Sequence, residues 1–407
     1  MDFEYGIIGG GPAGYTAGMM LAKQGHSVVL FEKDKLGGTC LNRGCIPTKS
    51  LLHSSEVYKQ ILNASEYGLD IEVKSFDFSK IAEKRDKTVE KIRKSLELAV
   101  KNSGVNVVYA EACAKDENTI FADGAEYKVS KIITATGSKP RELKGLEFDH
   151  EFVLNSDDVL KLDKLPKSVL IIGSGAIGIE WARIFSNFGV EVSIVELSEH
   201  LIPLADIEIS KRIERIFKQK KIKFYLNDCV EKIENNVVTL KSGINIEPDF
   251  VLSAVGRVPV QLDLGVNIGD SAGEIQLAHY AISQAQKLAC GVEYNKDLIP
   301  AVIYGEPEIA WVGLREQDCG EDCEKLMLPI TALGKSWCDE ATDGFIKLIV
   351  KDKQILGAHI VSKEASALIH EVLIAIQNGV TTDKLCEVCF AHPTYSEGIA
   401  ISIKQMI

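Results

Sequence analysis

Residues 5–14 form the stretch that decides the fold, Tyr5-Gly6-Ile7-Ile8-Gly9-Gly10-Gly11-Pro12-Ala13-Gly14. An apolar run ends here in glycines, and a helix of small residues is predicted from the turn to about Gln24. A second apolar strand over residues 27–32 ends at Glu32. Glycines in such a turn let the backbone approach a pyrophosphate at a helix N-terminus, and an acid after the next strand accepts hydrogen bonds from ribose hydroxyls. The stretch therefore predicts a dinucleotide site.

The same pattern recurs in the middle of the chain. An apolar strand over residues 168–172 precedes the turn Gly173-Ser174-Gly175-Ala176-Ile177-Gly178, a helix continues to Phe188, and a strand over residues 190–195 ends at Glu196. The repeat predicts a second dinucleotide site. An acid in this position favours NAD over NADP, because it would repel a 2′-phosphate.

Two cysteines stand five residues apart in the segment Gly37-Gly38-Thr39-Cys40-Leu41-Asn42-Arg43-Gly44-Cys45-Ile46-Pro47-Thr48-Lys49. Pro47 suits the first turn of a helix that runs toward Ile61, so Cys45 is expected just before its N-terminus, where the helix dipole stabilises a thiolate. Lys49 follows one turn later, and Cys40 is expected in the preceding, more accessible loop. An inner thiolate and an outer thiol are what disulfide exchange requires. Two buried structural cysteines are the alternative, and no metal site is expected because no second ligand pair lies near in the sequence.

A histidine near the C-terminus is the candidate base for this exchange. The loop His392-Pro393-Thr394-Tyr395-Ser396-Glu397 places Glu397 where it can orient and polarise His392. Histidine before proline is often structural, but the acid that follows favours a catalytic interpretation.

Composition limits the class of protein. The chain has 407 residues, 46% of them hydrophobic and 26% charged, and this length predicts two or three domains. The net charge of −12 argues against nucleic acid as a partner. No run of about 18 apolar residues predicts a membrane span, and no signal peptide is visible, so a cytoplasmic location is expected. Most of the ten cysteines should then be reduced, and a disulfide is more often catalytic than structural.

Further segments complete the organisation. Residues 80–103 predict a long, charge-rich surface helix, and residues 131–137, 250–256 and 266–270 predict short strands. From about Leu298 the pattern changes to a separate α+β domain. Its strands are predicted over residues 309–312, 326–331, 345–350 and 355–361, and its amphipathic helix over 364–378 is followed by Gly379 and, after the His392 loop, by a final helix.

These motifs resemble the flavoprotein pyridine nucleotide–disulfide oxidoreductases, and most closely their dihydrolipoamide dehydrogenase branch. The resemblance extends over nearly the whole chain and rests on Gly9–Gly14, Gly37–Lys49, Ala135-Thr136-Gly137, Gly173–Glu180, Gly256-Arg257, Gly269-Asp270, Leu277-Ala278-His279 and His392–Glu397. It implies an α/β fold with two Rossmann-like, three-layer dinucleotide-binding domains and an α+β C-terminal dimerisation domain. The implied boundaries are 1–139 with 257–297 for FAD, 140–256 for NAD, and 298–407 for the interface.

The resemblance also implies an activity. Dihydrolipoyl groups would be oxidised to lipoyl groups by NAD⁺ through FAD and a redox-active Cys40–Cys45 disulfide. Cys40 would exchange with substrate, Cys45 would contact the flavin, and Lys49 would pair with Glu180. His392, polarised by Glu397, would act from the other subunit of a homodimer. The implied partner is a lipoyl domain of a 2-oxo acid dehydrogenase or glycine cleavage complex, and the implied role is in cell redox homeostasis.

Residues are assigned to each cofactor by the same resemblance. Those expected at FAD are Gly9, Gly11, Pro12, Ala13, Gly14, Glu32, Lys33, Gly38, Thr39, Lys49, Thr136, Gly137, Asp270, Gln276, Leu277, Ala278 and His279. Those expected at NAD are Gly173, Gly175, Ala176, Ile177, Gly178, Glu180, Glu196, Val230 and Gly256.

Some features of the sequence differ from the usual pattern of the family. The alternative functions are therefore a related glutathione- or mercuric-reductase-like enzyme, or a non-catalytic flavoprotein. The segment between Arg257 and Asp270 is shorter than is usual for the family, and we expect omitted residues there, with natural trimming as the other explanation, because lost strands should weaken the core. Phe390 stands where a histidine is common. Cys386 with Cys389, and Cys319 with Cys323, are expected to be small buried residues on helices rather than metal or redox sites.

Overall fold

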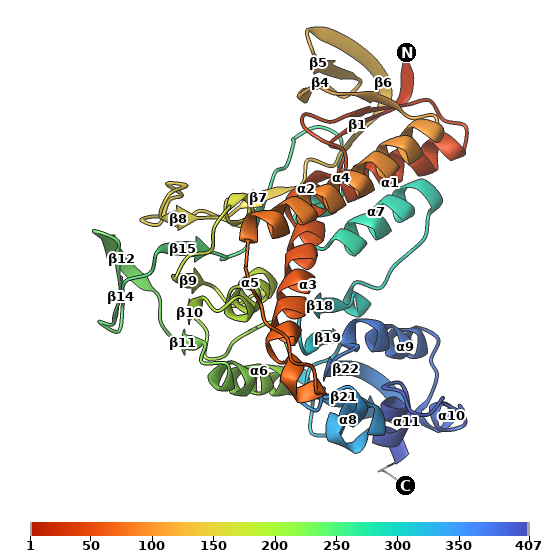
Figure 1. Ribbon diagram of the computed structural model, residues 1–407. Helices are drawn as coiled ribbons and strands as arrows, with labels where there is room; N and C mark the ends of the chain where they lie inside the picture. Colours follow the sequence, from red (N-terminus) through yellow and green to blue (C-terminus); the bar gives the residue numbers. More distant parts are fainter. Residues whose placement is uncertain (1, 405–407) are drawn as a thin grey trace.

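A largely parallel sheet around β1 (Phe3–Ile8) forms one end of the protein, seen in a computed structural model that describes residues 2–404 (Figure 1). Its strand order is β3-β2-β1-β6-β5-β4, with β17 added beside β6. The further strands are β2 (Val28–Phe31), β3 (Asn106–Val108), β4 (Ala112–Asp116), β5 (Thr119–Ala122), β6 (Ala125–Thr134) and β17 (Val266–Asn267). Every residue of β2 is buried, as expected for a parallel strand covered on both faces.

Helices of small residues cover this sheet. α1 (Pro12–Lys23) buries Ala13, Gly14, Ala17 and Gly18 and packs against α7 (Ala278–Cys290). Gly14 faces Gly9 and Gly18 faces Ile7, so the glycines let α1 lie close to the sheet. The long helix α4 (Phe78–Asn102) is capped by Asp77, whose side chain accepts a hydrogen bond from Ser79 N. Its charged surface and apolar stripe agree with the predicted surface helix.

A second, parallel sheet has the order β11-β10-β9-β15-β8. Its strands are β8 (Val153–Leu154), β9 (Ser168–Ile172), β10 (Glu191–Val195), β11 (Lys223–Tyr225) and β15 (Phe250–Ser253). The helices α5 (Ala176–Asn187) and α6 (Ile207–Gln219) connect it, with the 3-10 turn η2 (Val159–Lys161) beside β8. β12 (Val230–Glu234), β13 (Val237–Leu240) and β14 (Asn245–Ile246) form a separate antiparallel sheet. It packs against the second sheet through Val238 and Leu240 of β13, which are buried in the contact.

The chain crosses between the two sheets through a short antiparallel pair. β7 (Ser138–Pro140) leads out of the first sheet, and β16 (Arg257–Pro259) pairs with it on the way back. The returning chain adds β17 to β6, then forms the 3-10 turn η3 (Gly269–Ala272) and α7.

The expectation of omitted residues between Arg257 and Asp270 stays a prediction, and the printed sequence connects these residues directly through β16 and β17. The core tolerates the short return for a physical reason. Val260 N donates to Gly137 O at 2.9 Å, and β17 pairs in register with Ile133 and Thr134, so the backbone groups of the returning segment find partners.

The C-terminal part is an antiparallel sheet of order β18-β19-β22-β21-β20, at the lower end of Figure 1. Its strands are β18 (Ala301–Ile303), β19 (Glu308–Gly313), β20 (Glu324–Pro329), β21 (Phe345–Lys351) and β22 (Gln354–Ser362). Its helices are α8 (Gly334–Cys338), α9 (Ala365–Gln377), α10 (Thr382–Cys386) and α11 (Glu397–Lys404), and its 3-10 turns are η4 (Lys296–Leu298), η5 (Glu316–Asp318) and η6 (Ile330–Ala332). The predicted strands and helices of the α+β part are all present.

Two helices hold the cysteines of the predicted redox segment. Cys40 lies in α2 (Gly38–Arg43) and not in a loop, and Cys45 is the first residue of α3 (Cys45–Leu62) rather than the residue before it. Both expectations were wrong by a small margin because the turn at Gly44 is only one residue long. α3 runs along α5, continues toward the C-terminal sheet and ends near the 3-10 turn η1 (Ala64–Tyr67) (Figure 1).

Candidate active site

The redox segment is docked directly on the first glycine turn. Gly37 N donates to Gly10 O at 2.8 Å, and an added Cβ at Gly38 would lie 2.7 Å from Gly11 Cα. Gly38 also has φ +56°, a conformation that favours glycine. The cysteines of α2 and α3 are therefore fixed relative to the N-terminus of α1.

The two thiols interact with each other. Both cysteines are half-buried and unbridged, which is the reduced form of the pair. A hydrogen bond from the Cys40 thiol lowers the pKa of Cys45 to about 7, against the opposing effect of burial, and Lys49 adds to this lowering. The same hydrogen bond raises the pKa of Cys40 well above its ordinary value. The inner residue, Cys45, is thus the thiolate of the pair.

Lys49 connects the cysteines to the second domain. Its Nζ donates to both carboxylate oxygens of Glu180, each at 2.8 Å, which is the pairing that the family resemblance implies. Burial lowers the pKa of Lys49, but the charge and hydrogen bond of Glu180 outweigh burial, so the net pKa is raised. Lys49 therefore stays protonated near the Cys45 thiolate.

Two residues that sequence reasoning missed complete this arrangement. Tyr304, just after β18, donates its backbone N–H to Glu180 Oε1 at 3.1 Å, and its ring centroid lies 4.7 Å from Lys49 Nζ. Arg183, one turn after Glu180 in α5 and only 1% exposed, donates from Nη1 to Tyr304 O at 2.7 Å. Arg183 stands among apolar residues in the sequence of α5, and a charged residue in such a run could have been recognised as one that needs a buried polar partner. Nothing in the sequence connects Tyr304 to Lys49, because more than 250 residues separate them.

The first glycine turn fits an FAD pyrophosphate. Gly11 caps α1 without a side-chain hydrogen bond, and Pro12 follows it, so no capping side chain occupies the helix N-terminus. An added Cβ at Gly14 would lie 1.9 Å from Gly9 O, so only glycine allows this approach of helix to turn. Glu32 accepts hydrogen bonds from Gly10 N and Asp34 N, each at 2.8 Å, which fixes its carboxylate at the end of β2.

Other residues predicted for FAD lie on two further segments around this turn. Asp270 in η3 accepts a hydrogen bond from Ser138 Oγ at 2.5 Å, and Ser138 also accepts one from Arg257 Nε at 2.8 Å. Leu277 caps the start of α7, again without a side-chain partner, and Gln276 precedes it. The remaining residues predicted for FAD are Ala13 in α1, Thr39 in α2, Thr136 and Gly137 after β6, and Ala278 and His279 at the start of α7. His279 Nε2 lies 2.8 Å from Pro300 O. Lys33 lies on the surface and forms an ion pair with Glu111.

The second glycine turn repeats the geometry of the first. Gly175 caps α5 without a side-chain partner and has open space where a Cβ would stand, whereas an added Cβ at Gly178 would lie 2.0 Å from Gly173 O. Glu196 accepts hydrogen bonds from Ser174 N at 2.8 Å and Ser174 Oγ at 2.7 Å. Ala176 and Ile177 form the first turn of α5, Gly256 follows β15, and Val230 begins β12 opposite Leu240.

The structure does not bring the candidate base to the cysteines within one chain. His392 Nδ1 lies 2.9 Å from Glu397 Oε2, so the expected pair is formed, and the His392 side chain is 74% exposed. The segment between α10 and α11 lies at the lower end of the molecule in Figure 1, whereas α2 lies above its middle, beside α1.

The other cysteine pairs differ from their expected description. Cys386 ends α10 and is half-buried, but Cys389 is exposed and lies beyond the helix. Cys319 and Cys323 lie in the turn between η5 and β20, and their sulfur atoms are joined. The prediction of small buried residues on helices is wrong for Cys389, Cys319 and Cys323, because the short polar turns that hold them lie at the surface.

Comparison with known proteins agrees with this geometry. The family described as "Pyridine nucleotide-disulphide oxidoreductase" matches residues 3–286, and its dimerisation domain matches residues 299–402. Dihydrolipoyl dehydrogenase of Chlamydia pneumoniae is 32% identical over an alignment that covers 97% of this chain and 95% of the relative. Dihydrolipoyl dehydrogenase of Bacillus subtilis is 31% identical, with 96% of each chain covered.

Solved structures share the fold. LpdA from Mycobacterium tuberculosis superposes with a TM-score of 0.90 at 23% identity, covering 99% of this chain and 100% of the other. The HOCl-induced flavoprotein disulfide reductase RclA from Escherichia coli gives a TM-score of 0.87 at 24% identity, with 99% of each chain covered. FAD and NAD(H) are the cofactors of the family. With both of its family regions matched, both glycine turns formed and the redox segment in place, the chain belongs to the pyridine nucleotide–disulphide oxidoreductases.

Proposed function

We propose that the protein is a dihydrolipoyl dehydrogenase that oxidises dihydrolipoyl groups with NAD⁺. The observation that carries the proposal is the Cys40–Cys45 pair, which is held on the first glycine turn. The pKa of the inner residue, Cys45, is lowered to about 7. Relatives that bear this name cover nearly the whole chain at 31–34% identity. The acid at Glu196 favours NAD as the nucleotide.

The reaction begins with the cysteines as a disulfide. One substrate thiolate attacks Cys40 Sγ, which forms a mixed disulfide and releases the Cys45 thiolate. His392 takes the proton of the second substrate thiol, and the resulting thiolate attacks the substrate sulfur of the mixed disulfide. The lipoyl ring closes and Cys40 leaves. Two electrons now reside on the cysteine pair, and Lys49 stabilises the Cys45 thiolate. A flavin held at the first glycine turn would supply the two-electron chemistry that links the cysteine pair to NAD⁺.

The glycine turns and their neighbours would hold the cofactors. Uncapped N–H groups at the start of α1 would bind the FAD pyrophosphate, with Glu32 at the ribose and Asp270 near the ribityl chain. Uncapped N–H groups at the start of α5 would bind the NAD pyrophosphate, with Glu196 at its ribose.

The active protein would be a homodimer in the cytoplasm that serves cell redox homeostasis. The dimerisation-domain match and the distance between α11 and α2 support a base supplied by the partner subunit. Cys113, Cys290 and Cys338 are exposed free thiols, as is usual in a reducing compartment. No helix among residues 2–404 has the length and apolar character to span a membrane.

The three domains would divide at 139/140, 256/257 and 297/298. The electron donor would be a lipoyl domain of a 2-oxo acid dehydrogenase or glycine cleavage complex.

The test is a pair of parallel assays on the purified protein. Turnover of dihydrolipoamide with NAD⁺ is expected, with little turnover of glutathione disulfide with NADPH in the control. Turnover in the control alone would assign the protein to the related disulfide reductases. Absence of turnover in both, from a folded and yellow protein, would favour a non-catalytic flavoprotein.

A further inference from the structure

A second cysteine pair lies outside the active site. Cys319 and Cys323 are half-buried, their Cα atoms are 6.3 Å apart, and this separation lies within the range that a disulfide spans. Their turn connects η5 to β20. The proposed mechanism makes no use of this pair, and disulfides in reducing compartments are usually catalytic or redox-sensing.

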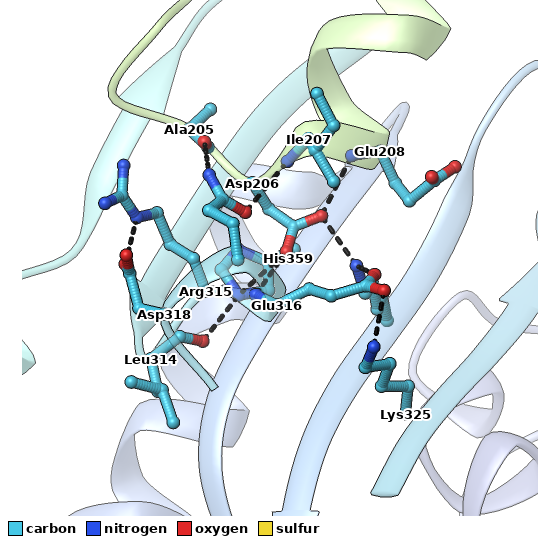
Figure 2. A network of polar contacts seen from close by, with 12 residues as sticks. Ala205, Asp206, Ile207, Glu208, Leu314, Arg315, Glu316, Asp318, Lys325 and His359 are labelled. Atoms are coloured by element: carbon cyan, nitrogen blue, oxygen red, sulfur yellow. Dashed lines mark hydrogen bonds and ion pairs between the residues drawn. The ribbon is translucent and has the colours of Figure 1, made fainter. Parts of the chain in front are cut away.

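Residues 315–317, just before Cys319, form hydrogen bonds with residues 204–207 at the start of α6, a helix that connects strands of the second sheet. We call this set of contacts the clamp. Figure 2 shows how the turn Arg315–Asp318 faces residues 205–208. The contacts are Glu316 N to Asp206 Oδ2 at 2.8 Å, Gln317 Nε2 to Ala205 O at 2.9 Å, Ile207 N to Gln317 Oε1 at 3.2 Å, and Arg315 Nη1 to Leu204 O at 3.3 Å. The clamp therefore joins the C-terminal sheet to the segment that enters α6.

This clamp is tied to the strand on the other side of the cysteines. Lys325 in β20, two residues after Cys323, donates to Glu316 Oε1 at 2.7 Å. The fully buried Asp206 accepts from Lys347 Nζ at 2.7 Å, and Lys347 also bonds Glu316. The disulfide thus bridges the two ends of a turn whose flanks meet at one ion-pair cluster, in which Asp206 and Lys347 are buried.

The clamped segment also reaches the second nucleotide turn. Ile202 N, two residues before Leu204, donates to Ser174 Oγ at 3.1 Å, and Ser174 Oγ donates to Glu196 at 2.7 Å. Ser174 stands inside the glycine turn, and Glu196 is the carboxylate proposed for the NAD ribose. A shift of residues 202–206 would therefore move the groups that position this carboxylate.

We propose that Cys319 and Cys323 form a second redox site whose oxidation state sets the affinity for NAD⁺. The inference rests on the proposed function, in which NAD⁺ binds at Gly173–Gly178. The oxidant would be a small-molecule disulfide. One cysteine thiolate attacks it and releases one thiol, and the second cysteine thiolate attacks the mixed disulfide and releases the other. The Cys319–Cys323 bond forms, and the two electrons and two protons leave with the small thiols. The oxidised form holds the clamp closed and binds NAD⁺ more tightly.

The experiment uses the full-length, FAD-loaded protein with Cys40→Ser and Cys45→Ser, so that a thiol reductant leaves the flavin-linked pair unchanged. The Kd of NAD⁺ is measured by calorimetry after treatment with glutathione disulfide and again after reduction, and mass-mapped alkylation reports the state of each cysteine. A Kd at least about five-fold higher in the reduced form is expected, a coupling of ordinary size between two sites.

Matched variants assign the effect to this pair. Adding Cys319→Ser and Cys323→Ser should abolish the redox dependence of the Kd, whereas adding Cys386→Ser and Cys389→Ser in the same domain should preserve it. Equal Kd values in the two states, or alkylation of both Cys319 and Cys323 after oxidant treatment, would overturn the inference alone. Failure of NAD⁺ to bind in either state would overturn the nucleotide assignment together with it.

Discussion

Cys45 and Cys40 have the same side-chain chemistry but different environments. Cys45 begins α3, accepts a hydrogen bond from the Cys40 thiol and lies near the protonated Lys49. These groups lower the pKa of Cys45, while Cys40 bears the proton and has a raised pKa. At the residue scale, the division of labour between the two thiols comes from their neighbours.

The pH dependence of Cys45 tests this division. In the reduced protein, alkylation mapped to Cys45 should rise with pH through a midpoint near 7, because the thiolate is the reactive form. Cys40→Ala removes the hydrogen bond and leaves the effect of burial, so the midpoint should move to higher pH. An unchanged midpoint in the variant would show that Lys49 or the helix start, and not Cys40, lowers the pKa.

Glu180→Gln tests the ion pair of Lys49. The change removes the counter-charge of a lysine whose side chain keeps 32% exposure, so we expect the free energy of unfolding to fall by about 1–3 kcal/mol, less than for a fully buried pair. The pKa of Lys49 should fall too, because burial is no longer outweighed. Urea unfolding measures the first effect. Glu83→Gln, which breaks an exposed pair with Lys87 in α4, is the control and should cost under about 0.5 kcal/mol. Equal costs in the two variants would contradict the assigned role of the pair.

At the element scale, two glycines of the second turn have separate tasks. Gly178 lets α5 approach β9, since an added Cβ would lie 2.0 Å from Gly173 O, while Gly175 has only open space around it. Gly178→Ala should therefore lower both the thermal stability and the affinity for NAD⁺. Gly175→Ala should keep the melting temperature but weaken NAD⁺ binding, because its methyl group would occupy the space expected for the pyrophosphate. Calorimetry with a melting curve separates the two, and strong NAD⁺ binding by Gly175→Ala would place the pyrophosphate elsewhere.

Local patterns predicted most elements correctly, for identifiable reasons. Buried strands such as β2 and β9 appear as short apolar runs, and glycine at the turns marks where the helices begin. The return from β16 to β17 could not be predicted, because its partners at Gly137 and Ile133 lie more than 100 residues away in the sequence. The turn that joins Cys319 to Cys323 was missed for another reason, since its acidic residues have no clear periodicity.

At the scale of the whole molecule, the cysteines and their candidate base lie on segments that one chain keeps apart (Figure 1). Subunit mixing tests whether a dimer brings them together. Cys40→Ser and His392→Ala should each be almost inactive alone. Co-expressed in equal amounts, they should regain about a quarter of the wild-type activity, because half of the dimers combine the two chains and each such dimer has one complete site. No gain on mixing, with dimers formed, would place the base in the same chain as its cysteines.

The sequence by itself determined the two nucleotide turns, the redox segment and the family, because these depend on residue types at short, fixed spacings. Only the tertiary structure decided the contacts between distant segments. It brought Tyr304 and Arg183 to the Lys49–Glu180 pair, placed His392 away from Cys40, and joined the turn at Glu316 to the start of α6. Such contacts depend on how sheets and helices pack together, and packing brings together side chains whose separation along the chain carries no signal.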